Sequence, residues 1–131
     1  MKTFVLLLAL VAVATLTSAP AAGSKGLDGR RQKATTIFND PVVLQGVTLK
    51  GEYLFVHDDA AMTRGEPCTR VYKGNAEMAS KLVVAFNCVP VERTRTAYFQ
   101  VRMLVVAPGV TEITEYQFKG DTEGHGVPRM K

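Results

Sequence analysis

The stretch Leu82-Val-Val-Ala-Phe-Asn-Cys88 is an apolar run that ends at a cysteine, and it predicts a buried strand. The other cysteine ends the stretch Arg64-Gly-Glu-Pro-Cys68 and stands directly before a shorter strand candidate, residues 69–73. Folding these two strands against each other brings the cysteines together, and the rest of the chain is expected to add further strands to this hairpin. In the register that centres the intervening loop, three pairs face each other: Tyr72 and Val84, Arg70 and Phe86, and Cys68 and Cys88.

The N-terminus has the layout of a secretory signal peptide. Lys2 precedes an apolar run of about ten residues, and Ala19 and Ala21 provide the small residues of a cleavage site. The run is shorter than the roughly 20 residues that a helix needs to cross a bilayer. We therefore expect residues 1–21 to be a signal peptide, the protein to be secreted or periplasmic, and no stable membrane insertion after cleavage.

Removal of the signal peptide leaves about 110 residues, the size of one domain. The net charge of the chain is +4, and four basic residues lie in a glycine-containing segment, residues 22–35. A basic leader can touch anionic polymers or lipid headgroups, but this composition is typical of a solvated arm. We predict a flexible basic leader at 22–35 and a single β-rich domain at 36–131 with an irregular C-terminal tail. Export disfavours nucleic acid as a partner.

Two cysteines in an exported chain predict a disulfide between Cys68 and Cys88. Closing a loop of about 20 residues stabilises a fold by roughly 3 kcal/mol in the chain-entropy model. A catalytic thiol pair is a poor alternative, because the spacing is not the C-x-x-C of redox sites.

Other segments predict short strands, at residues 42–49, 53–56, 96–106 and 111–118. Turns are expected at Asn39-Asp40-Pro41 and Lys50-Gly51-Glu52. Between 96 and 106 every second residue from Ala97 to Val105 is apolar, which predicts one buried face. The fold class is therefore all-β: a small antiparallel sandwich or barrel of about six strands with one or two short helical turns.

The chain has two histidines, and both stand in polar, loop-like contexts: His57 at a strand end and His125 in a glycine-flanked tail. Together with Asp58, Asp59 or the reduced cysteines, these imidazoles could bind zinc or copper. No spacing matches a recognised metal signature. We therefore predict a protein without a cofactor and keep metal binding as the alternative.

The segment His57-Asp58-Asp59 also raises the question of catalysis. Neighbouring carboxylates can shift each other's pKa and act as acid and base. On a strand, however, adjacent side chains point to opposite faces. Capping of a helical turn at 60–64, which Gly65 would end, explains both aspartates without a substrate. We therefore predict a non-catalytic protein and keep a small hydrolase as the third possibility.

Some aromatic residues are expected to face outward, while core packing is the default for most. A binding face for a glycan or an envelope protein is predicted at Tyr98, Gln100, Arg102 and Tyr116. The neighbouring arginines fit a solvated face equally well.

Three stretches, "GEYLFVHDDAAMTRGEPCTRVYKG", "KLVVAFNCVPVERTR" and "TEYQFKGDTEGHGVP", resemble a group of uncharacterised small secreted bacterial proteins. The resemblance covers most of the mature chain. It implies export and a compact β-fold, and it implies no activity or site residues. The sequence thus predicts an exported, non-catalytic envelope or extracellular interaction module, with a periplasmic metal-binding protein that uses His57 and His125 as the alternative.

Overall fold

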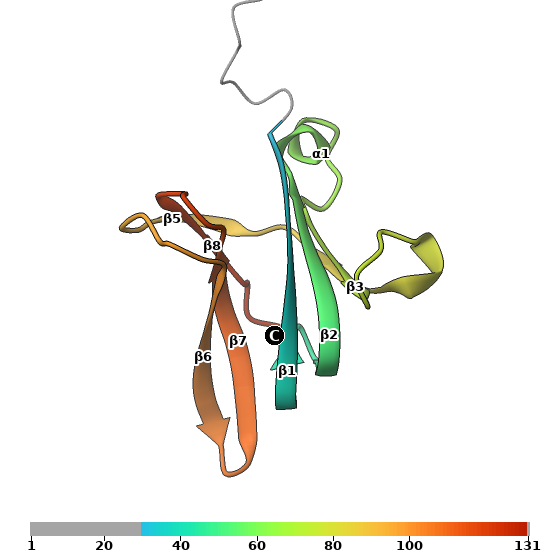
Figure 1. Ribbon diagram of the computed structural model, residues 1–131, viewed down its shortest axis with the longest axis vertical. Coiled ribbons are helices and arrows are strands. Elements are labelled where there is room, and N and C mark those ends of the chain that lie inside the picture. Colours follow the sequence, from blue (N-terminus) through green and yellow to red (C-terminus); the bar gives the residue numbers. More distant parts are fainter. Residues whose placement is uncertain (1–29, 131) are drawn as a thin grey trace, which may run out of the picture.

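The computed structural model describes residues 30–130, so the predicted signal peptide and the leader as far as residue 29 lie outside the described residues. The described part forms eight strands and two short helical turns (Figure 1). The strands are β1 (Arg31–Leu44), β2 (Val47–Asp58), β3 (Thr69–Lys73), β4 (Leu82–Phe86), β5 (Val89–Glu92), β6 (Gln100–Ala107), β7 (Val110–Gln117) and β8 (Glu123–Gly126). The helical turns are α1 (Asp59–Thr63) and the 3-10 turn η1 (Ala79–Lys81). The predicted all-β class is confirmed, with eight strands in place of about six.

All strands belong to one sheet, and the sheet is curled. Its order is β4-β3-β2-β1-β7-β8-β5, and β6 pairs with β7 off this path. β4 and β5 lie at opposite ends of the path, yet only Asn87 and Cys88 separate them in the chain. A flat sheet would hold these strands about 29 Å apart, whereas the link from Phe86 to Val89 reaches at most about 11 Å. The sheet must therefore curl until its two ends meet near Cys88.

One strand pair departs from the predicted antiparallel arrangement. β1 and β7 run parallel where Val43 faces Glu112, and the other pairs are antiparallel. The sheet is therefore mixed, because β7 approaches the free side of the β1–β2 hairpin after a long excursion of the chain.

The β1–β2 hairpin contradicts two predicted turns. Its turn is Gln45-Gly46, whose φ angles of 49° and 77° suit the type I′ turn of tight hairpins. Asn39-Asp40-Pro41 and Lys50-Gly51-Glu52 lie instead inside the strands, around a shift in register between Phe38 and Val42. Proline has no N–H to offer the ladder, so the strand bulges at Pro41 and then continues.

The predicted leader boundary at residue 35 is also wrong, because β1 begins at Arg31 and pairs with β2 from there on. Its basic side chains are not a free arm: Arg31 and Lys33 both form ion pairs with Glu77. In this part of β1, exposed charged side chains alternate with partly buried ones. Their composition is the same as that of a flexible arm, so composition alone gave the wrong prediction.

The main core covers one face of the sheet. Its fully buried members include Leu44, Leu49, Phe55, Val71, Ile113 and Tyr116. The Phe55 ring lies 5.5 Å from the Tyr116 ring and 5.4 Å from the Phe99 ring, measured between centroids. Leu54, Val56 and Tyr72 form a smaller cluster, as expected for the alternate positions of β2 and β3. Burial of each large apolar side chain contributes about 1.5–3 kcal/mol.

The β3–β4 hairpin exists, but its predicted register is wrong by one residue at Arg70 and by two at Tyr72. Arg70 faces Ala85 instead of Phe86, and Tyr72 faces Leu82 instead of Val84. An irregularity between Val71 and Tyr72 takes up one extra residue of β4. The cysteines still come together, because each lies just outside the end of its strand.

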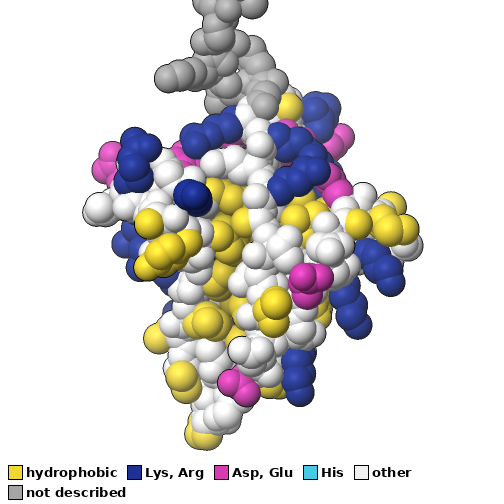
Figure 2. All heavy atoms as spheres, viewed as in Figure 1, with side chains coloured by type: hydrophobic (Ala, Val, Ile, Leu, Met, Phe, Trp, Pro, Cys, Tyr) yellow, Lys and Arg dark blue, Asp and Glu magenta, His cyan; other side chains and the backbone are white. Residues whose placement is uncertain are grey.

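The strand predicted at 96–106 begins later and is mostly uncovered. Thr96 hydrogen-bonds through its hydroxyl to the backbone of Tyr98, and this local pairing replaces a ladder. β6 then pairs with β7 in a hairpin whose turn forms one tip of the molecule, where apolar side chains are visible at the surface (Figure 2). Val105 is 69% exposed, so the predicted buried face is wrong for this end of the strand.

The predicted helical turn after β2 is confirmed. Asp58 accepts a hydrogen bond from the Ala60 amide at 3.0 Å and caps α1, and Gly65 follows the helix with a φ of 72°. Among the described residues, no helix has the length and apolar character that a membrane crossing requires.

Candidate metal centre

Four nitrogen and sulfur donors from separate parts of the chain meet where the curled sheet closes. His57 lies near the end of β2, Cys68 directly before β3, Cys88 in the link between β4 and β5, and His125 in β8. The ligand atoms of His57, Cys88 and His125 all lie within 4.8 Å of one another. The Cys68 Sγ lies 2.9 Å from the Cys88 Sγ.

The two imidazoles lie face to face at this point. Their ring centroids are 4.0 Å apart, with an angle of 34° between the planes. The Nδ1 of His125 lies 3.6 Å from the Cys88 Sγ, so one ring edge is directed at the sulfur. Two imidazoles and one thiol around one point, with a second thiol beside the first, form a donor set that suits zinc or copper.

The predicted loop-like contexts of the histidines are wrong, because both side chains are buried in strands. His57 is 2% exposed and His125 is 1% exposed. His57 stands two residues after Phe55 and therefore shares its core face. His125 faces the buried Tyr116 across the β7–β8 ladder, and their rings stack at 4.9 Å. The sequence did contain a signal for this position. If the alternation of side chains along β2 is continued past Val56, His57 falls on the same face as Phe55.

The glycines beside His125 explain why this tail is a strand rather than an irregular segment. A Cβ atom on Gly124 would lie 2.5 Å from Oε2 of Glu115, and one on Gly126 would lie 3.1 Å from the carbonyl oxygen of Val89. Both are closer than side-chain carbons normally approach. Gly-His-Gly therefore allows β8 to fit between β5 and β7, with His125 directed inward.

The polar atoms of the two rings lack ordinary partners. Four buried side-chain polar atoms among residues 30–130 have no hydrogen bond, and three of them are Nδ1 and Nε2 of His57 and Nε2 of His125. Asp59 Oδ1 lies 3.4 Å from His57 Nδ1, but the geometry is not that of a hydrogen bond. An unpaired buried polar atom destabilises a fold by about 1–3 kcal/mol, and a bound ion is one established reason for such an atom.

Burial and close contacts within the site shift the pKa values of three of the donors. Burial, and after it the charge of His57, lowers the pKa of His125 to about 4, so its imidazole is neutral at pH 7. The hydrogen bond from Cys88 lowers the pKa of Cys68, and the same contact raises the pKa of Cys88. The Cys88 amide also donates to the Cys68 Sγ at 3.0 Å.

Both cysteines are free thiols in this structure, so the predicted disulfide is not formed here. Their separation of 2.9 Å exceeds the bond length of about 2.05 Å. Their adjacency confirms that the two cysteines meet. Whether oxidation joins them stays a prediction.

The two aspartates of the predicted metal set differ in position. Asp58 is occupied by the helix cap and by ion pairs with Arg31 at 3.8 Å and Arg64 at 4.0 Å. Asp59 alone approaches the centre, beside His57. Asp58 and Asp59 therefore do not converge on one point. This agrees with the expectation that adjacent side chains at a strand end point to opposite faces.

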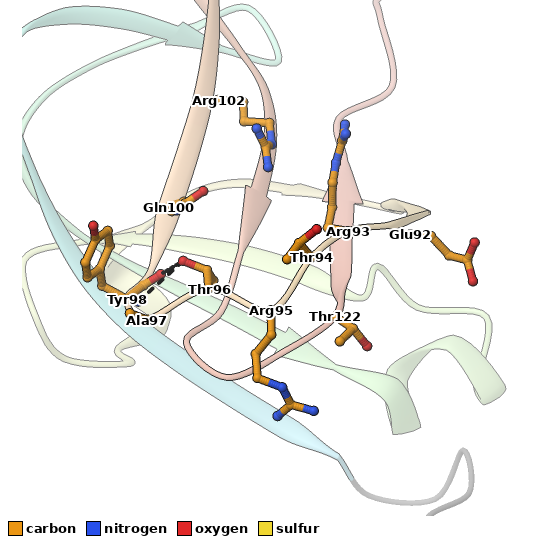
Figure 3. A pocket seen from close by; sticks show the side chains of 10 residues that line it. All are labelled: Glu92, Arg93, Thr94, Arg95, Thr96, Ala97, Tyr98, Gln100, Arg102 and Thr122. Carbon is orange, nitrogen blue, oxygen red and sulfur yellow. Dashed lines mark hydrogen bonds between the residues drawn. The ribbon is translucent and has the colours of Figure 1, made fainter.

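The predicted binding face is divided by the fold. Tyr98, Gln100 and Arg102 line one polar cleft of about 720 Å³ (Figure 3). Tyr116 is 0% exposed, so its predicted outward position is wrong. Its hydroxyl hydrogen-bonds to Thr69, and its ring packs against His125, because its position in β7 faces the core.

Comparison with family models, curated proteins and solved structures gave no match for this chain. The resemblance to small secreted bacterial proteins therefore stays an expectation, and the arguments about function rest on the residues themselves.

Proposed function

We propose that the protein is an exported, non-catalytic metal-binding β-domain, which holds one zinc or copper(I) ion through His57, Cys88 and His125, with Cys68 as a fourth donor. The observation that carries this proposal is the set of unpaired ring nitrogens. Three buried imidazole nitrogens without hydrogen bonds converge beside two thiols. Each neutral imidazole has one lone pair, so an ion bound by both rings would satisfy one nitrogen of each.

The donor types narrow the choice of ion. Thiolate and imidazole ligands suit zinc and copper(I), whereas calcium and magnesium require oxygen ligands. Asp59 lies 3.4 Å from Nδ1 of His57 and Glu123 lies 3.6 Å from Nδ1 of His125, and both carboxylates are better suited to orient the rings than to replace a nitrogen or sulfur donor. A site in which protein supplies all four donors, each of them buried, is typical of structural rather than catalytic zinc.

A disulfide-stapled interaction module is the second candidate, and the sulfur contact of 2.9 Å is the observation that favours it. In a secreted or periplasmic setting the two thiols can be oxidised, and a disulfide leaves no thiolate for the metal. The two candidates therefore exclude each other in any one molecule.

Titration of the reduced, chelator-treated protein with Zn²⁺ and, under anaerobic conditions, with Cu⁺ tests the proposal. We expect one ion per chain. Cys88→Ser and His125→Gln should each weaken binding by at least about tenfold, the lower end of losses measured when groups that support a metal site are removed. Substitution with Co²⁺ should give the visible bands of a tetrahedral ion with thiolate ligands.

Asp58→Asn is the matched control, because Asp58 lies next to the histidine in sequence and caps α1 instead of facing the centre. Asparagine caps helices as well as aspartate does. Metal affinity should therefore be unchanged in this variant. Absence of binding above buffer in the fully reduced wild type, together with thiols that resist alkylation in the protein as secreted, would replace the metal centre with the disulfide staple.

A further inference from the structure

A second site lies in the polar cleft of about 720 Å³ between the segment at 92–98 and β6 (Figure 3). Its volume is within the range of about 300–1,000 Å³ that is usual for ligand pockets. Three arginines line it, Arg93, Arg95 and Arg102, against one lining carboxylate, Glu92. None of the four donors of the metal centre is among its lining residues, so the cleft can be considered independently.

A buried carboxylate beneath the cleft positions two of the arginines. Glu115 accepts hydrogen bonds from Nε and Nη2 of Arg93, at 2.8 and 2.6 Å, and from Nε of Arg102, at 3.0 Å. In Figure 3 the Arg93 side chain points up and the Arg102 side chain points down, from separate segments of the chain. One carboxylate thus fixes two guanidinium groups that would otherwise repel each other.

These contacts leave donors available for a ligand. Glu115 carries one negative charge against two positive charges. Within residues 30–130, no hydrogen bond engages either terminal nitrogen of Arg102 or Nη1 of Arg93. Pre-positioned guanidinium groups with free N–H donors are suited to bidentate binding of a carboxylate.

An exposed tyrosine lines the same cleft. Tyr98 is 68% exposed, although a buried threonine fixes its backbone: Thr96 Oγ1 donates to the Tyr98 carbonyl at 2.9 Å. An aromatic ring presented on a fixed backbone offers an apolar face and a hydroxyl at little cost in conformational entropy. Gln100 adds an amide that can both donate and accept hydrogen bonds.

We propose that this cleft binds an acidic sugar, a uronic acid unit of an extracellular glycan. Arg93 and Arg102 would bind the carboxylate, Tyr98 would pack against the sugar ring, and Gln100 would hydrogen-bond its hydroxyl groups. The combination identifies the ligand class: the arginines select an anion, the exposed ring selects a flat apolar face, and the amide selects neighbouring hydroxyls. A neutral sugar would leave the arginines unused, and an inorganic anion would leave Tyr98 unused.

The test is calorimetric titration of the full mature chain with a short α-1,4-linked oligogalacturonate. Its fully methyl-esterified form serves as the matched ligand, since it has the same sugar backbone without the charge. We expect binding of the acid form and at least about tenfold weaker binding of the ester, which corresponds to the loss of one charge-assisted interaction. Poly-glutamate of equal charge should bind more weakly than the oligogalacturonate. Equal affinity for poly-glutamate would show general attraction of polyanions and would overturn the sugar class.

Variants separate the cleft from the rest of the surface. Arg102→Gln should lower affinity by about tenfold or more, and Arg64→Gln should not change it, because Arg64 lies outside the cleft and pairs with Glu66. Tyr98→Ala keeps the proposal testable if Arg102→Gln perturbs the fold, since an exposed ring can be removed with little effect on stability. Unchanged binding in Tyr98→Ala, or equal losses in the Arg64 and Arg102 variants, would overturn the proposal. Cys88→Ser should retain sugar binding, which makes failure of this site distinguishable from failure of the metal centre.

Discussion

Glu115 is a buried carboxylate whose charge depends on two arginines. The hydrogen bonds from Arg93, and after them those from Arg102, hold its pKa below the ordinary value of 4.5 although burial acts in the opposite direction. In the unfolded chain this carboxyl group takes up a proton at a higher pH than in the folded protein. Its contribution to stability is therefore complete above pH 4.5 and is lost as the pH falls through the lowered pKa.

Glu115→Gln should accordingly change the acid limb of the stability curve. Urea unfolding between pH 3 and pH 7 should show that the wild type loses more stability below pH 4.5 than the variant does. At pH 7 the variant should be less stable by roughly 1–3 kcal/mol, because a buried charge-assisted pair is weakened. Arg64 and Glu66 form an exposed pair, and Glu66→Gln is the control that should leave the curve nearly unchanged. Parallel pH curves for wild type and Glu115→Gln would contradict the assignment.

At the residue scale, the sequence identified every donor of the candidate metal centre but not their meeting point. Cys68 and Cys88 were predicted to pair, and His57 and His125, placed in loop-like contexts, were metal ligands only in the alternative prediction. Their convergence depends on the contact between β7 and β8 and on the closure at Cys88. Contacts this far apart in sequence leave no local periodic signal. Glu115 was missed for the same reason, since its arginines lie in other segments.

β8 is an element whose position depends on a glycine. Gly124 faces Gln117 of β7 and Val91 of β5, and a Cβ atom there would meet the Glu115 carboxylate and the Arg93 side chain. The carboxylate cannot move aside easily, because two arginines hold it. Gly124→Ala should therefore lower the free energy of unfolding by roughly 1–3 kcal/mol, the usual effect of inserting a methyl group where there is no space. Urea denaturation at pH 7 measures this loss.

A double-mutant cycle provides the control for this prediction. In the Glu115→Ala background the atom that the new methyl group would meet is gone, so Gly124→Ala should be less destabilising there than in the wild type. Equal losses in both backgrounds would assign the effect to the backbone of β8 instead of to the contact with Glu115.

At the element scale, the predictions that depend on local sequence rules were correct. The helical turn capped by Asp58 follows local rules and was correct. β6 shows the limit: its alternation from Val101 to Val105 is that of a strand with one buried face, but the β6–β7 hairpin extends past the elements that could cover it. The alternation of apolar residues shows which side chains a strand could bury. Whether they are buried depends on which other parts of the sheet cover that face. Residues 123–126 were predicted to be irregular but form a strand. The sequence does not distinguish glycines that permit close packing from the glycines of a loose tail.

The whole molecule is a sheet whose two ends are joined at one point. Cys88 lies in the two-residue link between the end strands, and His57 and His125 reach it from β2 and β8. A metal ion bound by His57, Cys88 and His125 would therefore join β2 and β8 at this closure, whereas a disulfide between Cys68 and Cys88 would join the neighbouring strands β3 and β4. Global stability should respond to both, and one variant can tell them apart.

The reduced protein with Zn²⁺ at about 100 times its dissociation constant should gain about 2.7 kcal/mol in the free energy of unfolding over the chelated protein. Oxidation of Cys68 and Cys88 without metal should stabilise the chain by roughly 3 kcal/mol in the chain-entropy model. His125→Gln removes a metal ligand but neither sulfur. It should reduce the gain from zinc to about 1.4 kcal/mol or less, the value for binding that is tenfold weaker, and retain the gain from oxidation. Urea unfolding of wild type and variant in the chelated, zinc-loaded and oxidised states measures all three. If His125→Gln gained as much from zinc as the wild type, His125 would not be a ligand of the ion, and the proposed centre would be wrong.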